Sequence, residues 1–235
     1  MGLSEKYDKF YQSDLWTEVL PEVTLQKRWP RDRMEAVIAY GGEGDRILDV
    51  GCGNGMLLWQ FRHAFKELIG LDYSHHRLEQ AKLNLKGWPF RPVFGSAEQM
   101  SEIEPASIDQ IVTADVIEHI PDVYAAVEEM FRVLKPGGIL IVNTPNIAFL
   151  KKRLRLLGGR FPSTSQPNEG IGDDILFDGG HLHYFTYRSL RILLERAGFR
   201  MVRRIGFGKL GWLHSIYPPL LSVGVQWVAT KVLAK

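Results

Sequence analysis

The stretch at residues 47–55 constrains the fold of this chain more than any other part of the sequence. It reads ILDVGCGNG, so an apolar run ending in Asp49-Val50 is followed directly by glycines at alternate positions. Such an apolar run is typical of a buried parallel strand, and glycine allows a sharp turn and the close approach of a ligand. The apolar residues 56–61 can begin a helix whose N-terminus faces that ligand. The stretch therefore predicts a nucleotide-type cofactor site at the first turn of an open α/β sheet.

The spacing of the glycines indicates which cofactor is bound. Dinucleotide-binding loops use G-x-G-x-x-G, whose third glycine lets the helix pack closely under a pyrophosphate. This chain has G-x-G-x-G at Gly51, Gly53 and Gly55, with Asp49 two residues earlier. A carboxylate so close would repel a pyrophosphate but suits a ligand that carries an ammonium group. The stretch closely resembles the first motif of class I S-adenosylmethionine-dependent methyltransferases, and an ordinary glycine-rich turn is the alternative.

The segments that follow agree with this family in order and spacing. Apolar residues 68–71 lead to Asp72, 17 positions after Gly55, where a carboxylate at a strand end can accept hydrogen bonds from both ribose hydroxyls. A helix cap before residues 75–85 is the alternative for Asp72. A helix is expected over residues 121–134, ending at R-V-L-K-P-G-G, which is a second hallmark of the family. Three more strands are expected within residues 92–98, 109–115 and 138–144.

The resemblance implies a Rossmann-like, doubly wound, seven-stranded-type α/β sheet, the class I methyltransferase fold, with an N-terminal helical lid and C-terminal additions. We expect one structural domain in three parts: a lid (1–44), a cofactor-binding core (45–145), and substrate-side additions with the end of the sheet (146–235). In the third part, Thr186 is expected to cap a helix over residues 187–197. A sixth strand is expected at residues 201–207.

The resemblance also implies which residues contact S-adenosylmethionine. Ser96-Ala97 stands where the family usually has Asp-Ala, in the turn that grips the adenine. Arg28, before a helix expected at residues 34–39, is a candidate cation for the methionine carboxylate. Cys52, the only cysteine, is expected to pack in the loop rather than act as a nucleophile. The expected cofactor-binding residues are Arg28, Asp49, Gly51, Cys52, Gly53, Gly55, Asp72, Tyr73, Ser96, Ala97, Glu98, Asp115 and Val116.

Residues 115–119, Asp-Val-Ile-Glu-His, follow the fourth strand and are expected beside the sulfonium. Offsets of three and four residues place Asp115, Glu118 and His119 on one side of a helical turn. His119 is a candidate general base for a hydroxyl, and Glu118 is a candidate for orienting it.

The same run resembles the E-x-x-E-H metal-binding sequence of small-RNA 2′-O-methyltransferases, and a similar run in ubiquinone-pathway O-methyltransferases. This resemblance implies a divalent cation, Mg²⁺ or Mn²⁺, held by Asp115, Glu118, His119 and His181. The alternative is a Glu-His pair without metal, as in many family members, with the later histidines holding a loop.

Charge is divided unevenly along the chain, whose formal net charge is +2. Residues 1–145 hold 15 Lys or Arg and 22 Asp or Glu, whereas residues 146–235 hold 14 and 5. A basic amphipathic helix is expected near residues 146–157, and residues 210–229 are apolar and aromatic. These features favour an anionic partner and peripheral membrane contact through residues 146–157 and 210–231. A solvated face, and a C-terminal helix packed on the sheet, are the alternatives.

These observations predict an enzyme of class EC 2.1.1, which O-methylates a hydroxyl on a lipid-linked, glycan or quinone-like acceptor by direct displacement. Small-molecule N- or C-methylation and a non-catalytic, cofactor-fold regulatory partner are the alternatives. No RNA-binding module is recognisable, which disfavours a nucleic-acid target. One cysteine excludes an internal disulfide, and the polar first ten residues are unlike a signal peptide. We therefore expect a cytoplasmic location, with contact to a membrane surface.

Overall fold

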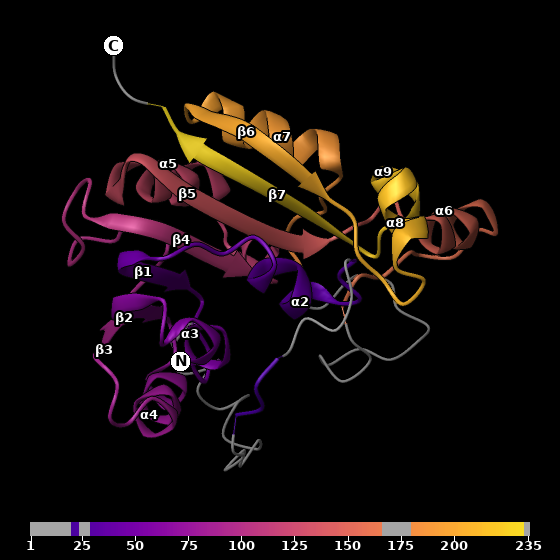
Figure 1. The fold of residues 1–235 in the computed structure, drawn as a ribbon. Helices are drawn as coiled ribbons and strands as arrows, with labels where there is room; N and C mark the ends of the chain where they lie inside the picture. The colour runs from indigo at the N-terminus through magenta and orange to yellow at the C-terminus, as the bar shows by residue number, and fades with distance from the viewer. Residues whose placement is uncertain (1–19, 24–28, 166–179, 233–235) are drawn as a thin grey trace.

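The computed structural model describes residues 20–23, 29–165 and 180–232. A seven-stranded sheet with the order β3-β2-β1-β4-β5-β7-β6 runs through the molecule (Figure 1). Strands β1 to β5 are parallel, and β7 is antiparallel to both of its neighbours. This confirms the predicted seven-stranded, doubly wound sheet. The strands are β1 (Gly44–Val50), β2 (Phe65–Asp72), β3 (Phe90–Phe94), β4 (Ile108–Ala114), β5 (Leu134–Pro145), β6 (Phe199–Ile205) and β7 (Gly224–Lys231).

The order of the strands reverses at β1, which lies between β2 and β4. The chain builds β2 and β3 to one side and then returns to build β4 and β5 on the other. In open α/β sheets, the loops leaving the carboxyl ends of the strands part at this reversal and form a crevice for a ligand. The glycine loop after β1 and residues 115–119 after β4 both begin here.

Helices cover both faces of the sheet (Figure 1). Two apolar clusters form the core: one lies between the sheet and α5 and α7, and the other between the sheet and α2 and α3. Side-chain caps fix where α4, α5 and α7 begin, at Ser74, Asp122 and, as predicted, Thr186. The helices are α2 (Arg33–Ile38), α3 (Met56–Phe61), α4 (His75–Asn84), α5 (Val123–Val133) and α7 (Tyr187–Arg196).

The segment at residues 210–229 differs from the sequence-based interpretations. It is divided into two short helices, α8 (Trp212–Ile216) and α9 (Pro218–Leu221), and the buried strand β7. The polar side chain of Gln226 is satisfied within this buried strand. Its Oε1 accepts from Asn143 Nδ2 at 3.0 Å, and its Nε2 donates to the Ala36 carbonyl at 2.7 Å. The exposed side chains of this segment all lie in residues 210–223.

Between β5 and α7 the chain forms α6 (Leu150–Leu157), which begins four residues later than expected and contains no buried residue. Helices α6, α8 and α9 stand together beyond one end of the strands (Figure 1). Within the described part of the chain, none of the helices has the length and apolar character needed to cross a membrane.

Candidate functional site

The glycine loop after β1 turns through left-handed backbone conformations. Gly51, Gly53 and Gly55 have φ angles of 75°, 53° and 82°, which favour glycine. A Cβ on Gly51 would lie 2.4 Å from Val116 Cγ2, so the loop packs directly against the segment after β4. A Cβ on Gly53 would meet no atom within 4 Å. The loop is thus closely packed on one side and open on the other.

Two carboxyl groups lie beneath this loop. Asp49 is 1 % exposed, and its Oδ1 has no hydrogen-bond partner among the described residues. Burial, and then the nearby charge of Asp72, raise the pKa of Asp49 to about 8. Asp72 Oδ2 accepts from the Gly53 amide at 2.8 Å, and its Oδ1 accepts from the Ser74 amide at 2.9 Å. These two bonds hold the carboxylate of Asp72 between the glycine loop and the start of α4, where Ser74 is the cap.

Cys52 and Tyr73 each follow one of these carboxyl groups in the sequence. Cys52 packs against β2, since a Cβ on Gly70 would lie 2.7 Å from its Sγ. Burial raises the pKa of the Cys52 thiol, so it is a packed side chain and not a thiolate. Tyr73 is 38 % exposed and stacks on Phe94, with ring centroids 5.9 Å apart.

The turn after β3 is stabilised by its own side chains. Ser96 Oγ donates to Glu98 Oε2 at 2.9 Å, and the Asp122 amide donates to Glu98 Oε1 at 2.7 Å. Ala97 packs against the core cluster under α5. The polar groups of Ser96 and Glu98 therefore shape the turn and connect it to the start of α5. A pocket of about 240 Å³ beside the turn is lined by Leu71, Val93, Phe94, Gly95, Ser96, Gln99, Met100, Ser101 and Glu102.

The chain leaves β4 through a strained turn. Asp115 has a φ angle of 54°, which is uncommon for a residue other than glycine. Residues in such conformations are found most often at functional sites. It forms an ion pair with Arg33 at the start of α2. The short helix η1 (Ile117–His119) follows. Arg28 lies outside the described residues, and Arg33 is a cation in the same N-terminal part that sequence reasoning missed.

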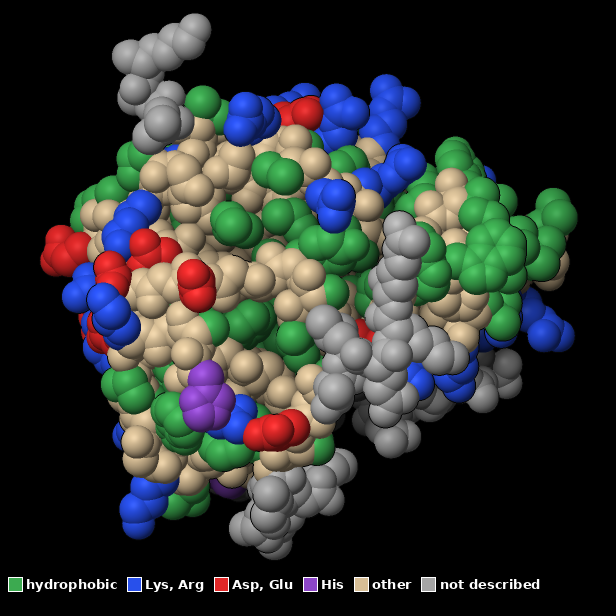
Figure 2. Space-filling model, viewed as in Figure 1, with side chains coloured by type: hydrophobic (Ala, Val, Ile, Leu, Met, Phe, Trp, Pro, Cys, Tyr) green, Lys and Arg blue, Asp and Glu red, His purple; other side chains and the backbone are tan. Residues whose placement is uncertain are grey.

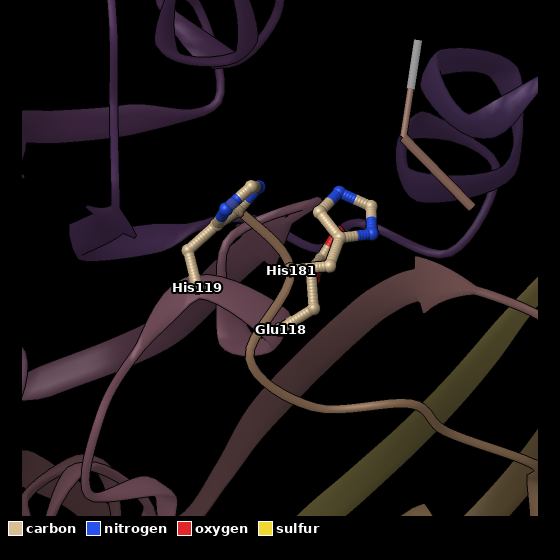
Figure 3. Close-up of side chains that lie close together, drawn as sticks. All are labelled: Glu118, His119 and His181. Atoms are coloured by element: carbon tan, nitrogen blue, oxygen red, sulfur yellow. The ribbon is translucent and has the colours of Figure 1, made fainter. Parts of the chain in front are cut away.

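Glu118, His119 and His181 come together at this turn (Figure 3). One ligand atom from each lies within 4.8 Å of the others, and the two imidazole ring centroids are 4.6 Å apart. Asp115, the fourth residue predicted for a metal, is not in this group. The structure therefore assembles three of the four predicted ligands.

Glu118 is 1 % exposed and has one satisfied oxygen. Its Oε2 accepts from Thr144 Oγ1 at 2.8 Å, whereas its Oε1 has no partner among the described residues. Burial, and then the charge of Asp115, raise the pKa of Glu118 to about 8. A buried carboxyl oxygen without a partner costs free energy, so this group is suited to receiving a proton donor or a cation.

A backbone group fixes the tautomer of His119. Its Nδ1 lies 2.6 Å from the Gly180 carbonyl oxygen. Because a carbonyl only accepts, Nδ1 carries the proton, and the lone pair of the neutral ring is at Nε2. Gly180, rather than Glu118, is thus the group that orients the imidazole.

The segment carrying His181 is attached to η1 by main-chain hydrogen bonds. The Leu182 and His183 amides donate to the Glu118 carbonyl, at 2.8 Å and 3.1 Å. His181 Nδ1 lies 2.7 Å from Thr164 Oγ1. His183 Nε2 lies 2.9 Å from the Ile120 carbonyl, so His183 holds the segment in place.

Comparisons with known proteins agree with this geometry. Residues 24–204 match the model of a family described as a methyltransferase domain. A ubiquinone biosynthesis O-methyltransferase of Alkalilimnicola ehrlichii is 33% identical over 108 residues, 45% of this chain and 44% of that protein. A "probable S-adenosylmethionine-dependent methyltransferase" of Mycolicibacterium smegmatis is 29% identical over 190 residues, 80% of this chain and 65% of that protein. The chain thus spans less than two thirds of the length of these relatives.

Solved structures share the fold. An S-adenosylmethionine-dependent methyltransferase of Mesorhizobium loti matches with a TM-score of 0.63 and 18% identity, over 84% of this chain and 95% of that one. Another, from Methanosarcina mazei, matches with a TM-score of 0.59 and 24% identity, over 83% and 96%. These likenesses show the Rossmann-like fold of class I methyltransferases. With a family model matched from residue 24 to residue 204, the chain belongs to the methyltransferase-domain family.

Proposed function

We propose that the protein is an S-adenosylmethionine-dependent methyltransferase that holds its cofactor at the glycine loop. The unpartnered, buried oxygen of Asp49 suits a ligand with an ammonium group, and the open side of Gly53 leaves room beside the loop. Asp72 is the residue for the ribose hydroxyls and Arg28 for the carboxylate. When bound, the cofactor supplies a methyl group on a sulfonium leaving group.

We propose further that the acceptor atom is a hydroxyl oxygen, on a lipid-linked, glycan or quinone-like molecule. The observation that carries this is the fixed tautomer of His119, because a lone pair at Nε2 can take the hydroxyl proton as the oxygen attacks the methyl carbon. Gly51 packs against Val116, in the same segment as His119, which supports a short distance between the glycine loop and the proposed base. The ubiquinone-pathway relative is consistent with a quinone-like acceptor.

The test uses radiolabelled methyl transfer to cell fractions separated into lipid, glycan, RNA and protein. Label is expected in the lipid or glycan fraction. His119→Ala should lower kcat by about 10²- to 10⁴-fold, because a positioned general base contributes that much, while the cofactor dissociation constant stays unchanged. A full rate from His119→Ala would remove the base. Tight cofactor binding without label in any fraction would favour a regulatory role.

The same cluster supports a second candidate, a divalent cation at Glu118, His119 and His181. Their ligand atoms lie within 4.8 Å of one another, and carboxylate and imidazole groups suit Mg²⁺ or Mn²⁺. The cation would lower the pKa of a bound hydroxyl. His119 Nε2 cannot hold a proton and a metal together, so the two candidates are alternatives for that atom.

Dialysis against a chelator, followed by readdition of Mg²⁺ or Mn²⁺, distinguishes the two candidates. If a cation is used, turnover is lost on dialysis and restored on readdition, and His181→Ala raises the cation concentration needed for half of the full rate. Turnover that survives dialysis unchanged leaves His119 as the base and removes the metal.

A further inference from the structure

Residues 146–165 and 206–223 form one surface feature, which we call the projection. Helix α6 belongs to the first range, and α8 and α9 belong to the second. Asn146 Nδ2 donates to the Ser222 carbonyl at 2.9 Å, and the Asn146 amide donates to the Val223 carbonyl at 3.1 Å. These bonds attach the segment that leads into α6 to the residues just after α9, and all three short helices lie at the same end of the sheet (Figure 1).

The projection exposes large apolar side chains. Leu157 is 85 % exposed and Leu156 63 % exposed, and no residue of α6 is buried. Hydrophobic side chains gather over this end of the molecule (Figure 2). Exposed large apolar side chains gathered at one end of a molecule indicate an interaction site. The most exposed large apolar side chains of the projection are Leu154, Leu156, Leu157, Leu210, Trp212 and Ile216.

Charge on the projection has one sign only. Residues 146–165 contain five Lys or Arg, residues 206–223 contain one, and neither range contains an Asp or Glu. Lys151, Arg153 and Arg155 are exposed on α6 among its leucines. Apolar and basic side chains on the same short helices suit a surface that is apolar inside and anionic outside.

A pocket at the base of α8 adds the same chemistry. Its volume is about 200 Å³, and it is lined by Trp29, Arg31, Lys209, Leu210, Gly211 and Trp212. Arg31 is held by Glu35, whereas Lys209 is exposed. Indole rings next to an ammonium group suit the headgroup region of a bilayer, because Trp is enriched at that depth and the lipid phosphates lie there.

Two contacts connect this pocket to the candidate site. The Gly208 amide donates to the Pro30 carbonyl at 3.3 Å, three residues before Arg33, which pairs with Asp115. The projection and the candidate site are thus both connected to the start of α2, the projection through Pro30 and the site through Arg33.

We propose that the projection docks the protein onto an anionic lipid bilayer, with Trp212 and the α6 leucines in the interface and the basic side chains on lipid phosphates. Helices of eight, five and four residues lie in the interface rather than span it. The docking goes beyond methyl transfer and does not depend on the identity of the acceptor. Its failure is therefore distinguishable from failure of the proposed activity.

The test measures co-sedimentation of the full chain with vesicles of phosphatidylcholine alone or with about one third phosphatidylglycerol. We expect binding to the anionic vesicles and much weaker binding to the neutral ones. Raising the salt from about 0.1 M to 1 M shortens the screening length about threefold and should release the protein. No binding, or equal binding to both vesicles, overturns the proposal.

Variants locate the surface. Lys151→Glu with Arg155→Glu should weaken partitioning at least about 25-fold, since each basic residue strengthens it about fivefold. Leu156→Ser with Leu157→Ser should weaken it on an unchanged fold, because both side chains are exposed. Leu83→Ser with Lys86→Glu, exposed on α4 and just after it, is the matched control and should bind normally. Equal loss in the control overturns the assignment, as does a lipid-independent dimer that the projection variants dissociate.

Discussion

At the scale of single residues, the candidate site is built from carboxyl groups in surroundings that oppose their charge. Burial raises the pKa of both Asp49 and Glu118 to about 8. In the unfolded chain both groups lose their protons near about pH 4. Between these pH values the folded, ligand-free protein therefore holds more protons than the unfolded chain. The free energy of unfolding must fall as pH rises through this range.

Replacing Asp49 tests this argument. Asp49→Asn removes one of the two titrating groups, so the decline in the free energy of unfolding between about pH 4 and pH 8 should become shallower. The affinity for S-adenosylmethionine should fall about tenfold or more, because a charged hydrogen-bond partner is lost. Urea unfolding across pH and calorimetry measure the two effects. An unchanged affinity would contradict the role of Asp49.

Two glycines provide a matched comparison. Gly53 and Gly87 both have positive φ angles, of 53° and 91°, and an added Cβ would meet nothing within 4 Å at either. Alanine should cost about 1 to 2 kcal/mol of stability at each position, from backbone strain alone. Only Gly53→Ala should also weaken cofactor binding, which calorimetry detects. Equal affinities in the two variants would show that the cofactor does not approach Gly53.

At the scale of secondary structure elements, Gln226 connects β5, β7 and α2. Replacing it with Leu leaves Asn143 Nδ2 and the Ala36 carbonyl without their partner. We expect a loss of about 2 to 6 kcal/mol in the free energy of unfolding, since each of the two buried unpaired groups costs about 1 to 3 kcal/mol. Thr230→Val is the control, because it removes one hydrogen bond, to the Gly138 carbonyl, on the same strand. Similar losses in urea titrations would show that Gln226 does not support α2.

Sequence patterns predicted the elements whose boundaries are set by residues close to them in the sequence. Apolar runs ending in Asp49 and Asp72 mark β1 and β2, and Thr186 marks the start of α7. β7 was not predicted within residues 210–229, because the contacts that hold it, such as those of Gln226 with Asn143 and Ala36, join residues far apart in the sequence. At the candidate site, local sequence motifs identified Glu118 and His119 but not the group that orients His119. The Gly180 carbonyl that fixes the tautomer of His119 is a backbone group 61 residues away, and no sequence signal reports it.

At the scale of the whole molecule, β7 determines whether the sheet is complete. It lies between β5 and β6, and β6 pairs with no other strand of the described chain. Truncation after Ser222 should therefore abolish cooperative unfolding, because β6 loses its partner and the buried edge of β5 is exposed. Truncation after Val232 keeps β7 and should unfold in one transition. Calorimetry of both truncated chains checks this, and a cooperative transition in the shorter one would contradict it.

The position of β7 has a consequence for biosynthesis. A ribosome completes β5 at Pro145 but does not finish β7 until Lys231, 86 residues later. At about 5 to 20 residues per second, the nascent chain spends roughly 4 to 17 s with the edge of β5 uncovered. Late in that interval β6 is completed at Ile205, and it has nothing to pair with until β7 follows. We therefore expect the nascent chain to depend most on chaperones in this window, because an unpaired strand edge is prone to aggregate.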